Sequence, residues 1–192
     1  MIKIRRGLDL HIAGKPEQVI HDGPVISQVA VVGSDYPGMK PTMAVREGDR
    51  VALGQLLFTD KKTAGVKYTA PASGVVVAVN RGERRVFQSL VIDVDGTEKE
   101  QFASFPADQL ASLERSVVVE NLVNSGQWVA LRTRPYAKVP APEATPASIF
   151  VTAMDTNPLA ADPEVIIAQR GEDFANGLKL LTRLTDGLVH LC

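Results

Sequence analysis

The spacing of apolar residues changes once along this sequence, near residue 105, and that change most constrains what the chain can fold into. Before it, short alternating or apolar runs are separated by Gly, Pro and Asp-Gly turns, a pattern typical of β structure. None of these runs has a helical period. Strands are expected over residues 25–32, 55–58, 75–79 and 86–94. This part of the chain therefore predicts a small β domain.

A helix is expected after the change of period. Pro106 and Asp108 suit its first turn, and Ser125-Gly126 would end it. Its apolar residues recur at i, i+3 and i+7: Leu110, Leu113 and Val117. Residues 131–147 then contain several prolines, whose missing backbone N–H groups argue against a continuous helix or a central strand. We interpret this stretch as a tethered connecting loop.

The end of the chain predicts a βαβ unit. Residues 149–151 are a short apolar run, and the Asp-Pro-Glu of residues 162–164 combines an N-cap, a first-turn proline and an acid near the helix N-terminus. The helix is expected to break at residues 170–171. It would resume with one apolar face: Phe174, Leu178 and Leu181. A last strand over residues 188–191 would pair in parallel with the first.

The fold class that follows is α+β and multi-domain. The β domain would occupy residues 1–100, the helix and Pro-rich loop residues 101–147, and the first βαβ part of an α/β domain residues 148–192. Two parallel strands covered on one side leave exposed edges and a bare face, which stable domains avoid. We therefore expect strands and helices after Cys192 to complete the second domain.

Charge and composition exclude several classes of protein. The formal net charge of −1 argues against nucleic-acid binding, which needs a concentrated basic surface. The longest uncharged stretch, residues 68–80, is well short of the ~20 apolar residues of a spanning helix, so the chain is expected to cross no membrane by itself. Cys192 is the single cysteine, which excludes an internal disulfide or a cysteine cluster and favours a reducing compartment.

Glycine spacing in the β domain resembles that of biotinyl/lipoyl carrier domains, which are flattened barrel-sandwich hybrids. Residues 48–49 (Gly-Asp) would make a tight turn into a strand, and residues 73–74 (Ser-Gly) the opposite reverse turn. The thin core is expected to contain Val51, Leu57 and Val76. Carriers present one lysine at the tip of the hairpin between these halves. Here the tip falls near residues 63–64, so Lys61 and Lys62 come too early, and solvated lysines on the loop shoulder are favoured.

A wider resemblance covers all 192 residues. Nine short motifs carry it: MIKI at 1–4, GLDL at 7–10, IAGKP at 12–16, HDGP at 21–24, KK at 61–62, APASG at 70–74, NRGE at 80–83, MDTNPLAADP at 154–163 and LTDG at 184–187. Together they resemble the NqrA family, whose members belong to the bacterial Na+-translocating NADH:quinone oxidoreductase.

The resemblance implies a peripheral subunit on the cytoplasmic side of the bacterial inner membrane. The pump oxidises NADH, reduces ubiquinone and exports Na+, and this subunit would contribute to quinone binding and to assembly with the other subunits. Those subunits would carry FAD, FMN, riboflavin and the 2Fe-2S centre, with no tightly bound cofactor in this chain. The resemblance assigns no catalytic residue or metal ligand here and leaves cofactor-binding residues unknown. The alternative is a free-standing lipoyl- or biotinyl-type carrier domain.

The same family is similar in fold to the flavin-carrying subunit of respiratory complex I, whose Rossmann-like domain wraps FMN with a glycine-rich loop. That loop would correspond to residues 124–131, where Trp128 and Val129 replace small residues. A second flavin loop would correspond to residues 155–158 (Asp-Thr-Asn-Pro). We infer a pocket whose flavin function is lost. Trp128 is expected to anchor a core or domain interface, and Asp155 and Asn157 to serve in a turn.

No nucleophile elbow, phosphate loop or dinucleotide fingerprint is present, so an autonomous hydrolase, NTPase or dehydrogenase is not expected. The histidines show no metal-ligand spacing and are interpreted as surface or structural residues: His11, His21 and His190. Two groups of arginines could steer an acidic partner or membrane headgroups, although solvated charges are the favoured interpretation: Arg132 and Arg134, and Arg81, Arg84 and Arg85.

Overall fold

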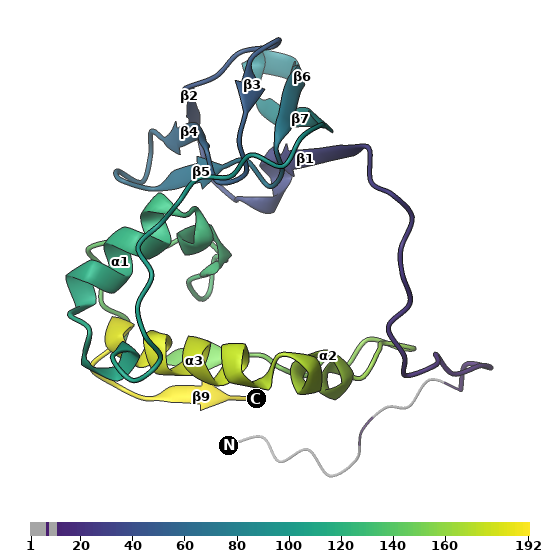
Figure 1. Cartoon of the computed structure of the whole chain (residues 1–192), viewed down its shortest axis with the longest axis vertical. Coiled ribbons are helices and arrows are strands. Elements are labelled where there is room, and N and C mark those ends of the chain that lie inside the picture. The colour runs from purple at the N-terminus through teal and green to yellow at the C-terminus, as the bar shows by residue number, and fades with distance from the viewer. Residues whose placement is uncertain (1–6, 8–10) are drawn as a thin grey trace.

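The computed structural model of the chain describes residue 7 and residues 11–192 (Figure 1). Two of the motifs behind the family resemblance, at residues 1–4 and 8–10, lie outside the described residues. Figure 1 shows a β barrel, a helix beneath it, and a layer of two further helices and a small sheet. Among the described residues, no helix is long and apolar enough to cross a bilayer.

The barrel consists of two antiparallel sheets. One has the order β1 (Gln28–Val32), β7 (Phe87–Val94), β6 (Gly74–Arg81) and β3 (Arg50–Val51). The other has the order β2 (Pro41–Met43), β4 (Leu56–Asp60) and β5 (Lys67–Thr69). All four predicted strands are present with shifted ends, whereas β2, which begins at a proline, was not predicted.

The first strand begins later than its apolar run suggests. Residues 25–27 lie outside β1, and the Val25 side chain is 98% exposed. The register explains this, because the ladder between β1 and β7 ends at the pair of Gln28 with Asp93. Without a partner strand, an apolar run has neither ladder hydrogen bonds nor a covered face.

The barrel core is thin and contains the residues expected there. Val51, Leu57 and Val76 are buried, and Phe58 stacks on Tyr68 with ring centroids 4.7 Å apart. The two sheets therefore enclose one narrow apolar layer, in which the few aromatic rings supply most of the volume.

The second part confirms the predicted βαβ unit. It contains α1 (Arg115–Asn124), β8 (Ile149–Val151), α2 (Pro163–Gln169), α3 (Gly171–Leu181) and β9 (Val189–Leu191). β8 and β9 pair in parallel. The Asp162 carboxylate accepts a hydrogen bond from the backbone N–H of Glu164 at 3.0 Å and caps α2, which Arg170 separates from α3. Local capping signals therefore located both ends of α2 correctly.

The predicted start of the first helix is wrong. The prediction begins that helix near Pro106, whereas α1 begins at Arg115. Leu110 lies in a single 3-10 turn (Leu110–Ser112), and Leu113 has an extended backbone. Side chains three residues apart also eclipse in a 3-10 turn, so the leucine spacing was satisfied without an α-helix.

One continuous apolar cluster joins the barrel to the second part. Its members outside the barrel are Val118, Val123, Trp128, Val139 and Leu184. The Pro-rich segment is irregular, as predicted, and it is held in place because the Arg115 guanidinium donates to the carbonyl oxygens of Pro142 at 3.2 Å and Ala144 at 2.8 Å. The connection is therefore packed against its surroundings along residues 139–144.

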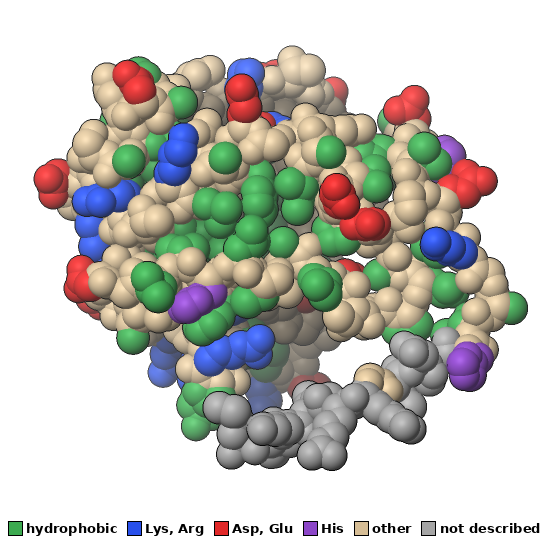
Figure 2. All heavy atoms as spheres, turned by 90° about the horizontal axis from the view of Figure 1, so that it is seen from below, with side chains coloured by type: hydrophobic (Ala, Val, Ile, Leu, Met, Phe, Trp, Pro, Cys, Tyr) green, Lys and Arg blue, Asp and Glu red, His purple; other side chains and the backbone are tan. Residues whose placement is uncertain are grey.

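The small sheet leaves one face uncovered, as the sequence predicts. Phe150 is 66% exposed and stacks on His190, with ring centroids 4.7 Å apart. Figure 2 shows hydrophobic side chains gathered near the middle of the face seen from below. An apolar groove of about 500 Å³ opens between α2, α3 and β8.

Candidate functional site

A crevice of about 710 Å³ lies where the barrel meets the loop that follows α1. The barrel contributes residues 30–36 and 69–71, and the loop contributes residues 125–132. Leu53 and Gly54, with Lys99, Glu100 and Phe102, complete the lining. These segments, which we call the crevice, are distant in sequence and meet only in the folded chain.

The crevice combines apolar walls with a few polar groups. Its apolar lining includes Val31, Leu53, Phe102 and Val129. At one end the Arg132 guanidinium lies over the ring of Tyr36, 5.1 Å from its centroid, and donates to the carbonyl oxygens of Leu131 at 3.0 Å and Asp35 at 3.4 Å. A cation held in this way by an aromatic face and backbone carbonyls is positioned in one place.

Gly126 determines how closely the loop after α1 approaches the barrel. Its φ of +76° is left-handed, and a Cβ there would overlap Thr69 Oγ1 and lie 3.0 Å from Thr69 Cβ. Thr69 Oγ1 donates to the Ser125 carbonyl oxygen at 3.2 Å, and Lys67 Nζ donates to Asn124 Oδ1 at 2.7 Å. The one glycine retained in the expected flavin loop therefore serves contact with β5.

Trp128 is an interface anchor, as the sequence predicts. Its side chain is 2% exposed, belongs to the shared apolar cluster and donates from Nε1 to the Pro140 carbonyl oxygen at 2.8 Å. The next residue, Val129, lines the crevice. The same short 3-10 turn (Gln127–Ala130) thus fixes the Pro-rich segment on one side and forms a crevice wall on the other.

The second expected flavin loop lies elsewhere. Asp155 Oδ1 accepts hydrogen bonds from the backbone N–H and the side-chain amide of Asn157, at 2.9 and 2.8 Å, in an exposed turn. Neither residue lines the crevice. Their geometry is that of the turn expected from the sequence.

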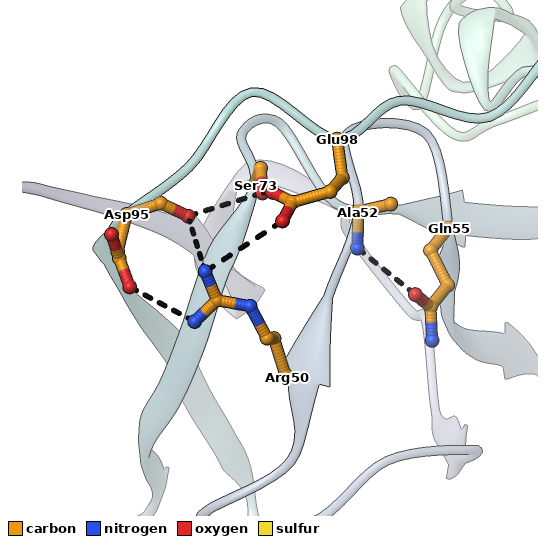
Figure 3. A network of polar contacts seen from close by, with 6 residues as sticks. All are labelled: Arg50, Ala52, Gln55, Ser73, Asp95 and Glu98. Atoms are coloured by element: carbon orange, nitrogen blue, oxygen red, sulfur yellow. Dashed lines mark hydrogen bonds and ion pairs between the residues drawn. The ribbon is translucent and has the colours of Figure 1, made fainter.

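A polar clasp holds the segment that carries Lys99 and Phe102 against the barrel (Figure 3). Arg50 Nη1 donates to Asp95 Oδ2 at 2.9 Å, and Arg50 Nη2 lies 3.8 Å from Glu98 Oε1. Ser73 Oγ donates to Glu98 Oε2 at 2.6 Å. The Ser73 hydrogen bond, more than the Arg50 charge, lowers the pKa of Glu98 below its ordinary value of 4.5.

The clasp predicts a pH-dependent difference between the native chain and the variant Glu98→Gln. A carboxylate whose pKa is lowered by folding stabilises the fold above its unfolded pKa, and this contribution is lost as the pH falls through the lowered, folded pKa. Glu98→Gln should therefore be less stable than the native chain at neutral pH, with the difference shrinking below about pH 4.5. Urea unfolding midpoints across this range measure it.

The matched control is Glu83→Gln, on the exposed turn between β6 and β7. It should leave the midpoints unchanged at neutral pH. A deficit in Glu98→Gln that stays constant down to pH 3 would contradict the assignment of a charge-dependent clasp.

The lysines singled out for a carrier lie where the sequence places them. The hairpin of β4 and β5 has its tip between residues 61 and 65, and Lys61 and Lys62 come at its first shoulder. Their side chains are exposed. Beyond the tip, the Gly65 position faces Pro142, 3.6 Å from where its Cβ would lie, so the Pro-rich segment flanks this hairpin.

The histidines are apart from one another and from the crevice. His21 lies 3.6 Å from Glu17 in the exposed N-terminal segment, and His190 stacks on Phe150 in β9. Within residues 11–192, no group of three or more His, Cys, Asp or Glu side chains is arranged to hold a metal ion.

Two family models match the chain in succession. Residues 2–95 match the NqrA N-terminal barrel-sandwich hybrid domain, and residues 113–192 match the NqrA second alpha/beta domain. The chain belongs to the NqrA family. These two domains of NqrA therefore correspond to the barrel and to the part that begins just before α1.

Curated relatives belong to the same enzyme. The NqrA subunits of the Na(+)-translocating NADH-quinone reductases of Hahella chejuensis, Teredinibacter turnerae and Saccharophagus degradans are 66%, 64% and 62% identical to this chain over 192 residues. Each match covers all of this chain and 43% of the relative. The chain thus spans less than half the length of these NqrA relatives.

Sequence reasoning located one wall of the crevice and missed the other. Residues 124–131 were singled out, but the barrel residues facing them, among them Tyr36 and Phe102, were not. The positive φ of Gly54, where a Cβ would lie 2.9 Å from the Phe102 ring, is the single local sign of that packing. A lone glycine in a turn carries too little information to predict it.

Proposed function

We propose that this chain acts within a Na+-translocating NADH:quinone reductase as part of a peripheral subunit on the cytoplasmic side of the bacterial inner membrane. Membership of the NqrA family and the names of its relatives support that assignment. Within the enzyme, the chain contributes to quinone binding and to assembly with the other subunits, which perform NADH oxidation and Na+ transport.

The observation that carries the quinone role is the chemistry of the crevice. A quinone headgroup is a flat, largely apolar ring with two carbonyl oxygens that accept hydrogen bonds. Val31, Leu53 and Phe102 offer an apolar surface for such a ring, while the Gln127 amide and the Arg132 guanidinium are donors along the same lining. Apolar walls with a few placed donors are typical of sites for small planar ligands.

We further propose that this chain binds no flavin tightly and that the flavins and the 2Fe-2S centre belong to other subunits. The relation to the Rossmann-like domain of the complex I flavin subunit belongs to this proposal. Gly126 is pressed against Thr69, and Trp128 is buried on Pro140. Both residues are thus engaged in protein packing at the place where a flavin loop would need open backbone.

The carrier alternative is less well supported. A swinging carrier needs its lysine at an exposed hairpin tip, within reach of a ligase. Lys61 and Lys62 precede the tip, and Pro142 flanks its far side. The β barrel-sandwich hybrid is therefore proposed to act here as a scaffold for the crevice.

Titration with a short-tailed ubiquinone tests the quinone role. Trp128 is the single tryptophan and adjoins Gln127 and Val129 in the crevice lining, so a bound quinone should quench its fluorescence in a saturable way. Arg132→Ala and Gln127→Ala should each weaken binding, the former by about tenfold because a hydrogen bond from a charged donor is lost.

Arg134→Ala is the matched control, since Arg134 is exposed and does not line the crevice. It should bind quinone as the native chain does. Quenching that rises linearly without saturation, to the same extent in all variants, would refute the crevice as a quinone site.

A further inference from the structure

Six basic side chains from three segments gather beside the crevice. We call them the basic surface: Lys40, Lys61, Lys62, Arg132, Arg134 and Lys138. The Lys61 backbone N–H donates to the Lys40 carbonyl oxygen at 2.8 Å, which joins the first two segments. The Lys138 side chain lies over Gly38, and Arg132 Nη2 donates to the Asp35 carbonyl oxygen, which joins the third.

The charges of the basic surface are not neutralised locally. All six side chains belong to exposed residues, and none forms an ion pair within 4.0 Å with a described Asp or Glu. The nearby Asp60 carboxylate is buried and accepts hydrogen bonds from the backbone N–H groups of Lys40 and Lys62, at 3.0 and 2.9 Å. Because the whole chain carries a net charge of −1, this concentration of positive charge is local.

A closed loop presents an aromatic residue within the basic surface. The Thr133 backbone N–H donates to the Lys138 carbonyl oxygen and the Ala137 N–H to the Thr133 carbonyl oxygen, both at 2.8 Å. Tyr136, at the apex, is 73% exposed and lies between Arg134 and Lys138 in sequence. Exposed Tyr beside Lys and Arg is typical of protein surfaces that lie at the level of lipid headgroups.

We propose that the basic surface binds anionic phospholipid headgroups and so turns the mouth of the crevice toward the membrane. This rests on the proposed quinone role, because a quinone dissolved in the bilayer must enter from the membrane surface. Arg132 belongs to both features. Lipid is favoured over an acidic protein segment because the charges are spread over three loops around one exposed aromatic residue, whereas protein partners concentrate binding in a packed pocket.

Vesicle flotation of the purified chain tests the proposal. Vesicles of phosphatidylcholine with roughly one-third phosphatidylglycerol should bind the chain at low salt, pure phosphatidylcholine vesicles should not, and about 0.5 M salt should abolish binding. The variant Lys61→Gln/Lys62→Gln/Arg134→Gln should bind between about tenfold and about a hundredfold more weakly. Arg81→Gln/Arg84→Gln/Arg85→Gln removes the same charge from the β6–β7 turn and should bind as the native chain does.

Two results would overturn the proposal: equal losses in both triple variants, or no binding to the anionic vesicles. Binding to native membranes that disappears once their proteins are stripped would also overturn it, in favour of an acidic protein partner. Quinone titration in vesicle-free solution reports separately on the crevice, because Lys61, Lys62 and Arg134 do not line it. Loss of lipid binding with intact quinone binding therefore concerns this inference alone.

Discussion

Replacing Trp128 with alanine should lower the free energy of unfolding by about 4 kcal/mol. The indole is 2% exposed and belongs to the apolar cluster that joins the barrel to the second domain. Its removal opens a cavity at that junction and leaves the Pro140 carbonyl oxygen without the Nε1 hydrogen bond. Urea unfolding followed by circular dichroism measures the loss, since the variant has no tryptophan fluorescence.

Two companion variants separate the contributions. Trp128→Phe keeps most of the ring volume and should cost about 1–2 kcal/mol, mainly for the lost hydrogen bond. Phe150→Ala removes an aromatic side chain that is 66% exposed and should cost less than about 1 kcal/mol. A Trp128→Ala variant no less stable than Phe150→Ala would mean that the indole does not anchor the junction.

Replacing Gly126 with alanine should destabilise the chain by about 3 kcal/mol, because two penalties add. The residue has a left-handed φ of +76°, and an added Cβ would overlap Thr69 Oγ1. Rotation of the threonine does not relieve the crowding, because its Cβ and Cγ2 would both lie 3.0 Å from the new atom. Either the loop moves away from β5 or the hydrogen bond to the Ser125 carbonyl oxygen breaks. Denaturation midpoints measure the effect.

The control is Gly177→Ala, in the middle of α3. No atom lies within 4 Å of a Cβ at that position, and alanine favours a helix by up to about 1 kcal/mol over glycine. This variant should be as stable as the native chain or more so. If Gly126→Ala matched it, the close approach of the loop to the barrel would be disproved.

Elements with local signals were predicted from the sequence. The Asp162 cap, the break at Arg170 and the hairpin tip near Thr63 each depend on a few neighbouring residues, and each is where it was expected. The start of α1 was wrong, because leucines three residues apart suit a 3-10 turn as well as an α-helix. The division into residues 1–100, 101–147 and 148–192 and the lost flavin site stay predictions.

The amino-acid sequence by itself determined the kinds of element, most of their order and, through its motifs, membership of the NqrA family. Only the tertiary structure decided that Tyr36, Phe102 and Arg132 line one crevice, and that three basic loops meet beside it. The physical reason is range. Capping, turns and apolar period act between close neighbours along the chain, whereas the crevice depends on packing between residues up to about a hundred positions apart, which local preferences do not encode.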